Sequence, residues 1–566
     1  MLKRKQKVIA FVFGIFLFAG EILPITVFAQ EFEDSPFGFH PAGVHQPGYA
    51  NNGLSDAQNI GVRWHRPPIY AFWFIVQPDT GDTTLDFSMY DQIYGTVPTS
   101  INILANIAPQ GHIDEGYCKP GSYLPIDSAK YVRFVKATVE RYDGDGIDDM
   151  PGLVNPIKYW QVGNEPLATT PSGFAQLQRI TYQAIKDACP ECKVLIGGTL
   201  QPMTSSGFTV DAKEYLNWFS IFYEPILTEL NGNYVNIFDL HWYGNATGDY
   251  RYCGAVLDSL KTILSEYNFG EIPIWITEMG SYSGDPNGPA FSYQSERQQA
   301  GDYLKRFVFP LSVGIKKVFP AFGLMEGFID DDSYFDHTGL IYNGEGSNDL
   351  GLGVKKLAYF SYKLMTSKLE GSIWNNILTL IDGTDNVYAY KFKKAESGEP
   401  VYVAWRDCFD DSIYTTGDSS LITLTGISSN QVMVTNAVPN DTSGIYITNF
   451  NTAFSIDTLT VSGGSVSFYL KEVPVFIEDY NATSVSEINL TGENIRIYPN
   501  PAKGIFTIEG TMIQKIELIN IGGQIIKQML IKDEPLIIDL SQQPKGIYFV
   551  KVTVDKGVVT KKIVVK

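Results

Sequence analysis

Short apolar runs alternate with longer amphipathic stretches over residues 37–367 of the 566-residue chain. The short runs are rich in β-branched and aromatic residues, as buried strands are, and the stretches between them repeat apolar residues at helical spacing. The eight predicted strands are Phe37–His40, Val62–Arg66, Ile101–Ile107, Ile157–Gly163, Val194–Thr199, Ile237–Trp242, Ile272–Thr277 and Lys317–Phe322. The predicted helices include Ala129–Tyr142, Gly173–Ala188, Lys213–Leu230, Val256–Tyr267, Ser295–Ser312 and Gly351–Ser367.

This alternation predicts parallel strands joined by crossover helices. Eight such units fit a (β/α)8 barrel, whose active site forms at the carboxyl ends of the strands. The alternative is a doubly wound open sheet, but the glycine-rich turn typical of its first strand does not follow Phe37–His40. We therefore predict an α/β fold with a (β/α)8 TIM barrel over residues 30–368.

The pattern changes after Glu370, where helical periodicity stops and alternating apolar and polar positions are separated by Gly, Asp, Asn and Ser. Such a pattern is typical of a β-sandwich, which we place at residues 369–478. Residues 479–493 are polar and rich in Ser, Thr and Asn, which suits a linker. Residues 494–566 are again β-rich and predict a small all-β domain.

The first 29 residues have the features of a secretory signal peptide. Basic residues lie between positions 3 and 7, Val8–Gly20 is apolar, and Ala29 follows as a small residue suited to cleavage. A membrane anchor is the alternative, but Glu21 interrupts the apolar stretch before it reaches the span of about 20 residues that a bilayer requires. We expect cleavage after Ala29 and an exported mature chain without a transmembrane segment.

The charge balance excludes some partners. Lys and Arg number 43 against 62 Asp and Glu, which gives a net charge of −19. Nucleic-acid binding depends on clustered basic residues, so no nucleic-acid partner is expected. Aromatic residues make up 13% of the chain and can either fill cores or stack on sugar rings.

Five cysteines are present, and two of them lie three positions apart. In an oxidising compartment Cys189 and Cys192 are expected to form a local disulfide. A zinc site is the alternative, but a second pair of ligands at suitable spacing is not visible. A bond between Cys118 and Cys253 stays open, because sequence alone does not decide connectivity.

Two glutamates follow predicted strands in a way that indicates chemistry. Glu165 ends the run Tyr159–Glu165 on strand four, and Glu278 ends the run Ile274–Glu278 on strand seven. These strands lie on opposite sides of a barrel mouth, so the two carboxylates should face each other. Glycoside hydrolysis needs such a pair, with one carboxyl protonating the leaving oxygen while the other attacks or stabilises the sugar.

The motifs resemble clan A of the glycoside hydrolases, the retaining (β/α)8 group, over about Phe37–Ser367. The resemblance rests on Asn164-Glu165, Glu278, the run Asp239-Leu240-His241-Trp242-Tyr243 and the run Gly61–Arg66. Together with the following sandwich it is similar to families 39, 51 and 30. It implies that Glu165 is the general acid/base, Glu278 the nucleophile and Asn164 a ligand of the sugar 2-hydroxyl.

The same resemblance implies further substrate-site residues. Tyr243 would hydrogen-bond the nucleophile, His241 would belong to the substrate or acid/base network, and Arg66 is favoured over Arg63. Phe322 stands in the region of strand eight where many clan members carry Trp. Independently of the resemblance, Trp73 and Trp242 lie in or near loops after strands, where stacking on sugar is expected. Trp160 and Trp275 precede the glutamates and are expected to be packing residues.

An acidic loop at Asp143–Asp149 is similar to a calcium-binding loop. Asp143, Asp145 and Asp148 are the predicted ligands of a structural calcium, because close carboxylates with glycines allow an oxygen cage. The EF-hand pattern is incomplete, and a solvated acidic loop is the alternative. The hydrolytic chemistry itself requires no cofactor.

The C-terminal segment has a resemblance of its own. Ile495–Pro501, Gly504–Phe506 and Gly546–Val552 resemble the C-terminal sorting domain of type IX secretion. The resemblance implies the type IX secretion machinery as a partner and a secreted or outer-surface location. A carbohydrate-binding sandwich is the alternative, but residues 494–566 contain no Trp.

The sequence thus predicts a secreted retaining glycoside hydrolase that cleaves β-linked polysaccharide or oligosaccharide. A non-catalytic glycan-binding protein on a barrel scaffold is one alternative, although both glutamates and Asn164 argue against it. An arabinofuranosidase-like exo-enzyme is the other.

Overall fold

The computed structural model describes residues 32–480 and 496–566, apart from short internal stretches. Those stretches are 45–48, 50–52, 82, 112–115, 167–169, 206, 288–289, 328–331, 346–348, 408–418, 510–512, 521–524, 531–535, 542 and 555–556. The predicted signal peptide and most of the predicted linker lie outside the described residues. The chain forms two compact units, residues 1–480 and 481–566, which are described separately.

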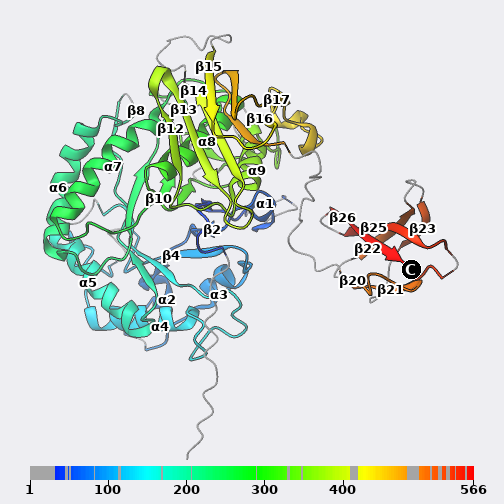
Figure 1. Cartoon of the computed structure of the whole chain (residues 1–566). Helices are drawn as coiled ribbons and strands as arrows, with labels where there is room; N and C mark the ends of the chain where they lie inside the picture. The colour runs from blue at the N-terminus through cyan, green and yellow to red at the C-terminus, as the bar shows by residue number, and fades with distance from the viewer. Residues whose placement is uncertain are drawn as a thin grey trace, which may run out of the picture. The chain divides into compact units, whose positions relative to one another are not determined.

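A parallel barrel forms the larger part of the first unit (Figure 1). Among the described residues its eight strands are β1 (Gly38–Phe39), β2 (Trp64–His65), β4 (Asn102–Ala108), β5 (Tyr159–Val162), β6 (Lys193–Leu195), β9 (Phe238–Trp242), β10 (Ile274–Met279) and β11 (Val318–Pro320). Parallel bridges Phe37–Val318 and Leu195–Ile237 join the two sheet segments into a closed ring. Every predicted strand overlaps one of these, so the predicted (β/α)8 class is confirmed.

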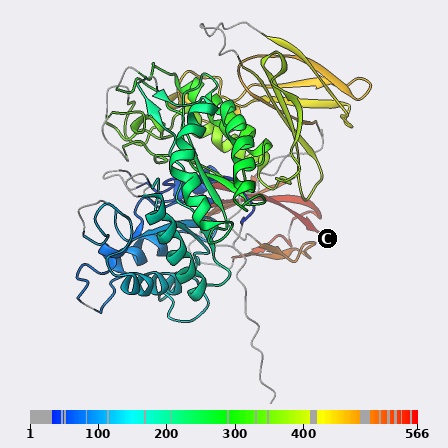
Figure 2. The same cartoon turned by 90° about the vertical axis from the view of Figure 1, so that its left-hand side faces the viewer.

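Helices cover the outside of the strands, as Figures 1 and 2 show. The main ones are α4 (Ser128–Tyr142), α5 (Pro171–Ala188), α6 (Ala212–Leu230), α7 (Asp249–Glu266), α8 (Glu296–Ser312) and α9 (Leu357–Leu369). Shorter elements are α1 (Ser55–Asn59), β3 (Ala71–Phe72), α2 (Trp73–Val76), α3 (Ser88–Gly95) and the hairpin β7 (Met203–Thr204) with β8 (Gly207–Phe208).

Side-chain caps explain where several helices begin. Asp127 accepts hydrogen bonds from the amides of the first turn of α4, and Ser295 with Gln298 forms a capping box on α8. The structure starts α7 at Asp249, seven residues before the predicted Val256. In the described part of the chain none of the helices has the length and apolar character needed to cross a bilayer.

The barrel interior is built in layers, because alternate residues of a strand face the same side. One layer is apolar and buried, with Trp64, Tyr159 and Trp275 packed ring against ring. Its members are Trp64, Leu104, Tyr159, Leu195, Ile237, Trp275 and Phe319. At Gly38 a Cβ atom would come within 2.6 Å of the Phe319 ring, so only glycine fits beside this layer.

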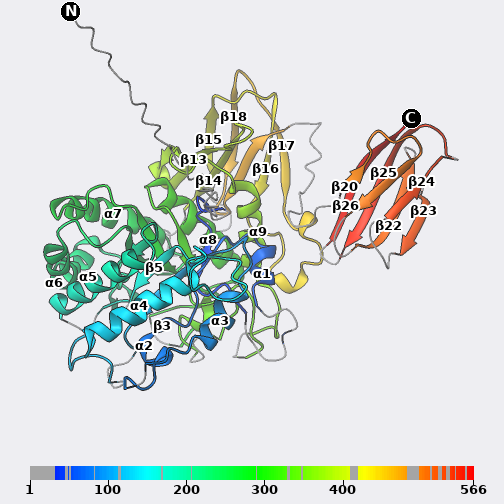
Figure 3. The same cartoon turned by 90° about the horizontal axis from the view of Figure 1, so that it is seen from below.

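A β-sandwich follows the barrel and packs against α8 and α9 (Figure 3). Its larger sheet has the order β12-β13-β14-β19-β16-β17, and β15 pairs with β18. The strands are β12 (Leu378–Asp382), β13 (Val387–Lys393), β14 (Pro400–Arg406), β15 (Ser420–Thr425), β16 (Gln431–Asn436), β17 (Ile456–Thr460), β18 (Ser465–Leu470) and β19 (Val475–Asp479).

The barrel and the sandwich share one core. Trp405 of β14 belongs to the same buried cluster as the barrel helices, and its indole donates a hydrogen bond of 2.8 Å to the Tyr250 hydroxyl. Asp407 accepts hydrogen bonds from Tyr250 and from the buried Lys305. A separate apolar cluster fills the space between the two sheets of the sandwich.

The second unit is a small all-β sandwich with its own buried core. Its strands are β20 (Arg496–Tyr498), β21 (Ile505–Glu509), β22 (Ile513–Asn520), β23 (Ile525–Leu530), β24 (Leu536–Asp539), β25 (Gly546–Val554) and β26 (Gly557–Val565). The all-β domain predicted for residues 494–566 is confirmed.

Cys189 and Cys192 form the predicted disulfide just after α5. The open alternative, a bond between Cys118 and Cys253, is not formed between these two described residues. Cys253 is buried on α7, and burial raises the pKa of its thiol to about 12. Cys408 lies outside the described residues.

Candidate active site

A polar layer lies two residues further along the strands than the apolar layer of the barrel. Arg66 is at its centre and is completely buried at the end of β2. Its guanidinium donates to Glu278 Oε1 at 2.7 Å, to Asn164 Oδ1 at 2.8 Å and to the side chains of Asn106 and Gln161 at 3.0 Å. Arg63, the residue not favoured, forms an ion pair with Glu370 instead.

Glu278 is fixed from two sides near the end of β10. Arg66 binds Oε1, and the Tyr243 hydroxyl donates to Oε2 at 2.6 Å. Pairing between β9 and β10 shifts register between Ile276 and Glu278. Such an irregularity re-aims side chains, so the consecutive residues Thr277 and Glu278 both contact groups of the polar layer.

Glu165 lies in the turn that follows β5, where Gly163 has a positive φ of 63°. The Glu165 side chain is 22% exposed, whereas that of Glu278 is 2% exposed. His241 Nδ1 lies 2.6 Å from Glu165 Oε1 and 3.4 Å from Glu278 Oε2. The structure therefore brings together Glu165, Glu278, His241, Tyr243, Asn164 and Arg66 from the sequence prediction.

The two carboxylates are close but differ in environment. One oxygen of each, together with a ring nitrogen of His241, lies in a group whose atoms are all within 4.8 Å of one another. Burial alone would raise the pKa of Glu278, but the positive charges of His241 and Arg66 lower it to about 2. Burial raises the pKa of Glu165, and this effect exceeds the opposing hydrogen bond and charge of His241. One carboxyl thus favours the anion and the other favours the acid.

His241 carries the positive charge between the two carboxylates. Burial alone would lower the pKa of His241, but the charges of Glu278 and Asp239 raise it to about 10. With Arg66 this cation already balances the carboxylates of Glu278 and Asp239. The charge balance therefore does not favour a metal ion between Glu165, His241 and Glu278.

Several polar residues of the site were missed by the sequence analysis. His40, on the strand segment that follows β1, lies with Nε2 3.8 Å from Glu278 Oε1, and its Nδ1 donates to the Arg66 carbonyl at 2.8 Å. Burial first, and then the charge of Arg66, hold the pKa of His40 well below its usual value. Gln161, Asp239 and Thr277 complete the layer. Their signal was a polar residue at every second position of an otherwise apolar strand.

Two predicted stacking residues are packing residues. Trp242 is 1% exposed, and its indole donates to the Asp249 carbonyl at 3.0 Å. It follows His241 on β9, so strand alternation turns it away from the barrel interior toward the helices. Trp73 is completely buried and packs edge-on against Tyr117. Trp160 and Trp275, expected to pack, are both buried.

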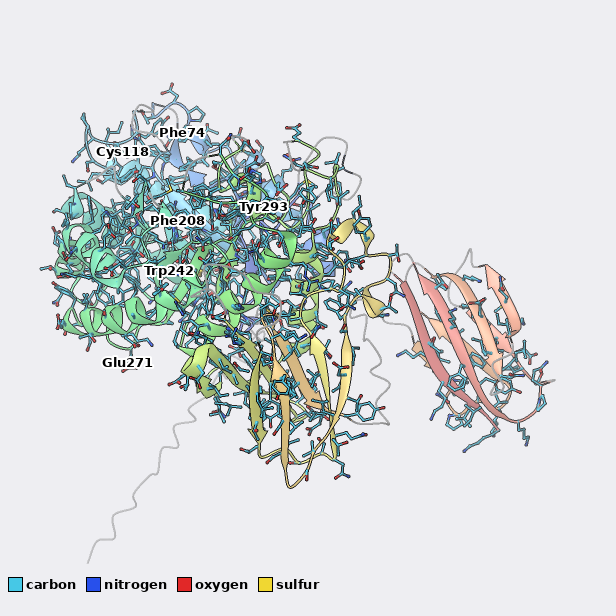
Figure 4. The ribbon with its side chains drawn as sticks, turned by 90° about the horizontal axis from the view of Figure 1, so that it is seen from above. Phe74, Cys118, Phe208, Trp242, Glu271 and Tyr293 are labelled. Atoms are coloured by element: carbon cyan, nitrogen blue, oxygen red, sulfur yellow. A yellow bond between two sulfur atoms is a disulfide. The ribbon has the colours of Figure 1, made fainter. Side chains whose placement is uncertain are left out.

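Partly exposed rings approach the site from two sides. Next to Arg66, Tyr70, Phe72 and Phe74 form a row with centroids 5.6 and 5.4 Å apart. Next to Tyr243, a second cluster holds the predicted Phe322 and three other partly buried rings. Those rings are Phe208, Phe291 and Phe335. Phe74, Phe208 and Trp242 are labelled in Figure 4.

The acidic loop after α4 differs in one member from the predicted calcium site. Carboxylate oxygens of Asp143, Asp145 and Asp149 lie within 4.8 Å of one another, and Asp148 is not part of this group. Asp148 has a positive φ of 48° at the turn. Asp149 accepts backbone hydrogen bonds from Gly144 and Gly146, which shape the loop. Calcium binding by this loop stays a prediction.

Comparisons with known proteins agree with the fold. Residues 187–308, which include His241 and Glu278, match the family model of a glycosyl hydrolase catalytic core. Residues 496–566 match the model of a secretion system C-terminal sorting domain. No curated protein matches the chain.

Two solved structures illustrate the shared fold. A family 39 glycoside hydrolase from the gut symbiont Bacteroides cellulosilyticus is 16% identical with a TM-score of 0.52, over 75% of this chain and 77% of that one. An α-L-arabinofuranosidase from Thermotoga maritima is 11% identical with a TM-score of 0.52, over 78% of this chain and 96% of that one. At these identities the likeness concerns the fold alone.

The catalytic-core match covers the part of the (β/α)8 barrel that carries His241 and Glu278, and Glu165 lies outside the matched residues. The protein is a glycosidase. Its C-terminal unit is a sorting domain that directs type IX secretion to the cell surface or the extracellular space.

Proposed function

We propose that the protein is a secreted retaining glycosidase that cleaves β-linked polysaccharide or oligosaccharide by double displacement. The observation that carries the proposal is the pair formed by Glu165 and Glu278, whose nearest oxygens lie within 4.8 Å. Retaining enzymes hold their carboxyl groups about 5–5.5 Å apart, whereas inverting enzymes hold them about 6.5–9.5 Å apart to admit a water.

Glu278 has the environment of the nucleophile. Arg66 and Tyr243 bind one oxygen each, and the neighbouring cations keep the carboxylate ionised. It attacks the anomeric carbon as the bond to the leaving oxygen breaks, which forms a glycosyl-enzyme.

Glu165 has the environment of the acid/base. Its raised pKa keeps a proton available for the leaving oxygen, and its partial exposure gives substrate access. After the first step its carboxylate takes a proton from the water that attacks the glycosyl-enzyme, and the free acid is restored. Asn164 is held by Arg66, and we expect it to bind the 2-hydroxyl of the sugar.

The surrounding rings support a saccharide substrate with several sugar units. The row of Tyr70, Phe72 and Phe74 is joined to the site through the hydrogen bond of 3.3 Å between Arg66 and Tyr70. Partly exposed aromatic faces suit the apolar faces of sugar rings. We therefore infer that sugar units beyond the cleaved bond stack on this row.

A screen of xylan, mannan, β-glucan and arabinan for reducing-end release identifies the substrate, with the Glu165→Gln variant as the control. NMR of the first product then shows which anomer forms. The expected result is release of the same anomer as in the substrate, and release of the opposite anomer would refute retention. Binding of a glycan without any reducing-end release would instead favour the non-catalytic alternative, and release of single arabinose units would favour the exo-enzyme.

A further inference from the structure

His241 is held by the buried carboxylate of Asp239, two residues earlier on β9. Both side chains are completely buried. His241 Nε2 lies 3.3 Å from Asp239 Oδ2 and 3.3 Å from Thr277 Oγ1, while Nδ1 lies 2.6 Å from Glu165 Oε1. The imidazole therefore connects Asp239 to Glu165.

Asp239 is itself fixed by donors from two other strands, β10 and β5. Thr277 donates its amide to Oδ1 at 3.0 Å and its hydroxyl to Oδ2 at 2.6 Å, and the Gln161 side-chain amide also donates to Oδ2. Three donors around one carboxyl match an acceptor-only carboxylate. A carboxylate so held is a fixed negative charge beside His241.

The chain leaves room for this pair at Gly198. A Cβ atom there would lie 2.0 Å from His241 Nε2 and 2.7 Å from Asp239 Oδ2. The backbone next to β6 thus accommodates the Asp239–His241 contact only with glycine at this position.

We propose that Asp239 is a positioning residue for the acid/base: it holds His241 as an imidazolium whose Nδ1–H donates to Glu165 Oε1. This inference rests on the proposed role of Glu165. With Oε1 occupied, Oε2 carries the proton that passes to the leaving oxygen as the glycosidic bond breaks. The imidazolium then stabilises the Glu165 carboxylate until it accepts a proton from water. Without Asp239, a neutral imidazole could accept the proton of Glu165 and direct it away from the substrate.

The charges around His241 determine the pH dependence. The titratable and charged groups around His241 and its carboxylate partners are Glu165 after β5, Glu278 on β10, Asp239 on β9, His40 after β1, Arg66 after β2, Tyr70 before β3, Tyr243 after β9, and Tyr215 and Tyr223 on α6. Replacing Asp239 by Asn removes one negative charge from this buried group. Each remaining proton is then lost more easily, so the pKa values of His241 and Glu165 fall.

The test compares the full-length Asp239→Asn variant with the wild type on two aryl glycosides of the sugar that the enzyme cleaves. For a poor leaving group we expect kcat/KM to fall about 10- to 100-fold, because part of the contribution of the general acid is lost. The alkaline limb of the pH profile should also move to lower pH. For a dinitrophenyl leaving group, which departs without protonation, the first step should change little. Equal losses on both substrates with an unmoved limb would overturn the proposal.

Asp302→Asn is the matched control, because Asp302 is also buried and pairs at 2.6 Å with Arg306 on α8, outside the polar layer. It should leave the alkaline limb where it is. If Asp239→Asn does not fold, nitrogen NMR of the histidine side chains in the wild type measures the protonation state of His241. The His241 signal is identified because it is absent from the spectrum of His241→Gln. An imidazolium at pH 8 supports the proposal, and a neutral ring overturns it. Failure of the proposed function would be distinguishable, because Glu278→Gln would then remain active.

Discussion

The apolar and the polar layers of the barrel interior lie on the same strands but have opposite roles. Trp64 and Arg66 are two residues apart on one strand, and so are Tyr159 and Gln161. Two residues correspond to about 7 Å along a strand. The apolar layer removes apolar surface from water. The polar layer buries charges that only neighbouring charges and hydrogen bonds can stabilise. Stability and chemistry are therefore separated by one strand repeat.

The largest loss of activity should come from a substitution in the polar layer. Replacing Glu278 by Gln removes the nucleophile, and kcat should fall about 10⁴-fold or more while circular dichroism still shows a folded barrel. Because Arg66 and Tyr243 still contact a side chain of the same shape, the fall in kcat should reflect the missing nucleophile and not a change in structure. Retention of more than a few per cent of the activity would remove Glu278 from the proposed role.

A substitution in the apolar layer should instead reduce stability and leave kcat nearly unchanged. Trp275→Ala leaves a cavity between Trp64, Tyr159 and Phe319, and the free energy of unfolding should fall by about 3–5 kcal/mol. Denaturant unfolding measures this change, and kcat of the folded fraction should stay within about threefold of the wild type. A large loss of kcat at unchanged stability would show that the two layers are not separable.

The charge on His241 predicts a pH dependence of stability. Its pKa is raised to about 10 in the folded protein, against about 6.5 in an unfolded chain. Its contribution to stability is therefore fully present below pH 6.5 and is lost as the pH rises through about 10. The unfolding free energy of the wild type should fall across this window relative to that of His241→Gln. If the unfolding free energies of the two proteins change with pH in parallel, His241 is not an imidazolium in the folded protein.

The smallest effect should come from outside both layers. Phe74→Ala removes the outer ring of the row beside Arg66, and kcat/KM on polysaccharide should fall about three- to tenfold, as expected for one stacking contact. An aryl monoglycoside should be cleaved at the normal rate. Tyr469→Ala, an exposed ring on β18 of the sandwich, is the control and should change neither.

The sequence predicted the eight strands and the two glutamates because both depend on local signals. Apolar runs mark strands, and Asn164-Glu165 and Glu278 lie at strand ends. Trp242 was mispredicted although strand alternation was available: His241 and Tyr243 face the site, so the residue between them faces the helices. Trp73 was mispredicted because a position near a loop does not reveal that a ring is covered.

Other features of the site depend on structure that sequence patterns do not encode. The register shift between β9 and β10 turns Thr277 and Glu278 toward the same network, and alternation alone would have separated them. In the acidic loop, the backbone turn at Asp148 brings Asp149 to the cluster instead. Both depend on backbone conformation at a single residue.

The contacts of Trp405 and Asp407 with α7 and α8 determine where the chain can be cut. A fragment ending near residue 368 would expose Tyr250 to solvent and leave Lys305 without Asp407. Such a fragment would aggregate rather than work as a minimal enzyme, because the apolar residues that pack against the sandwich would be exposed to water. The practical truncation point for crystallisation or biotechnology lies after Tyr480, where the two compact units separate.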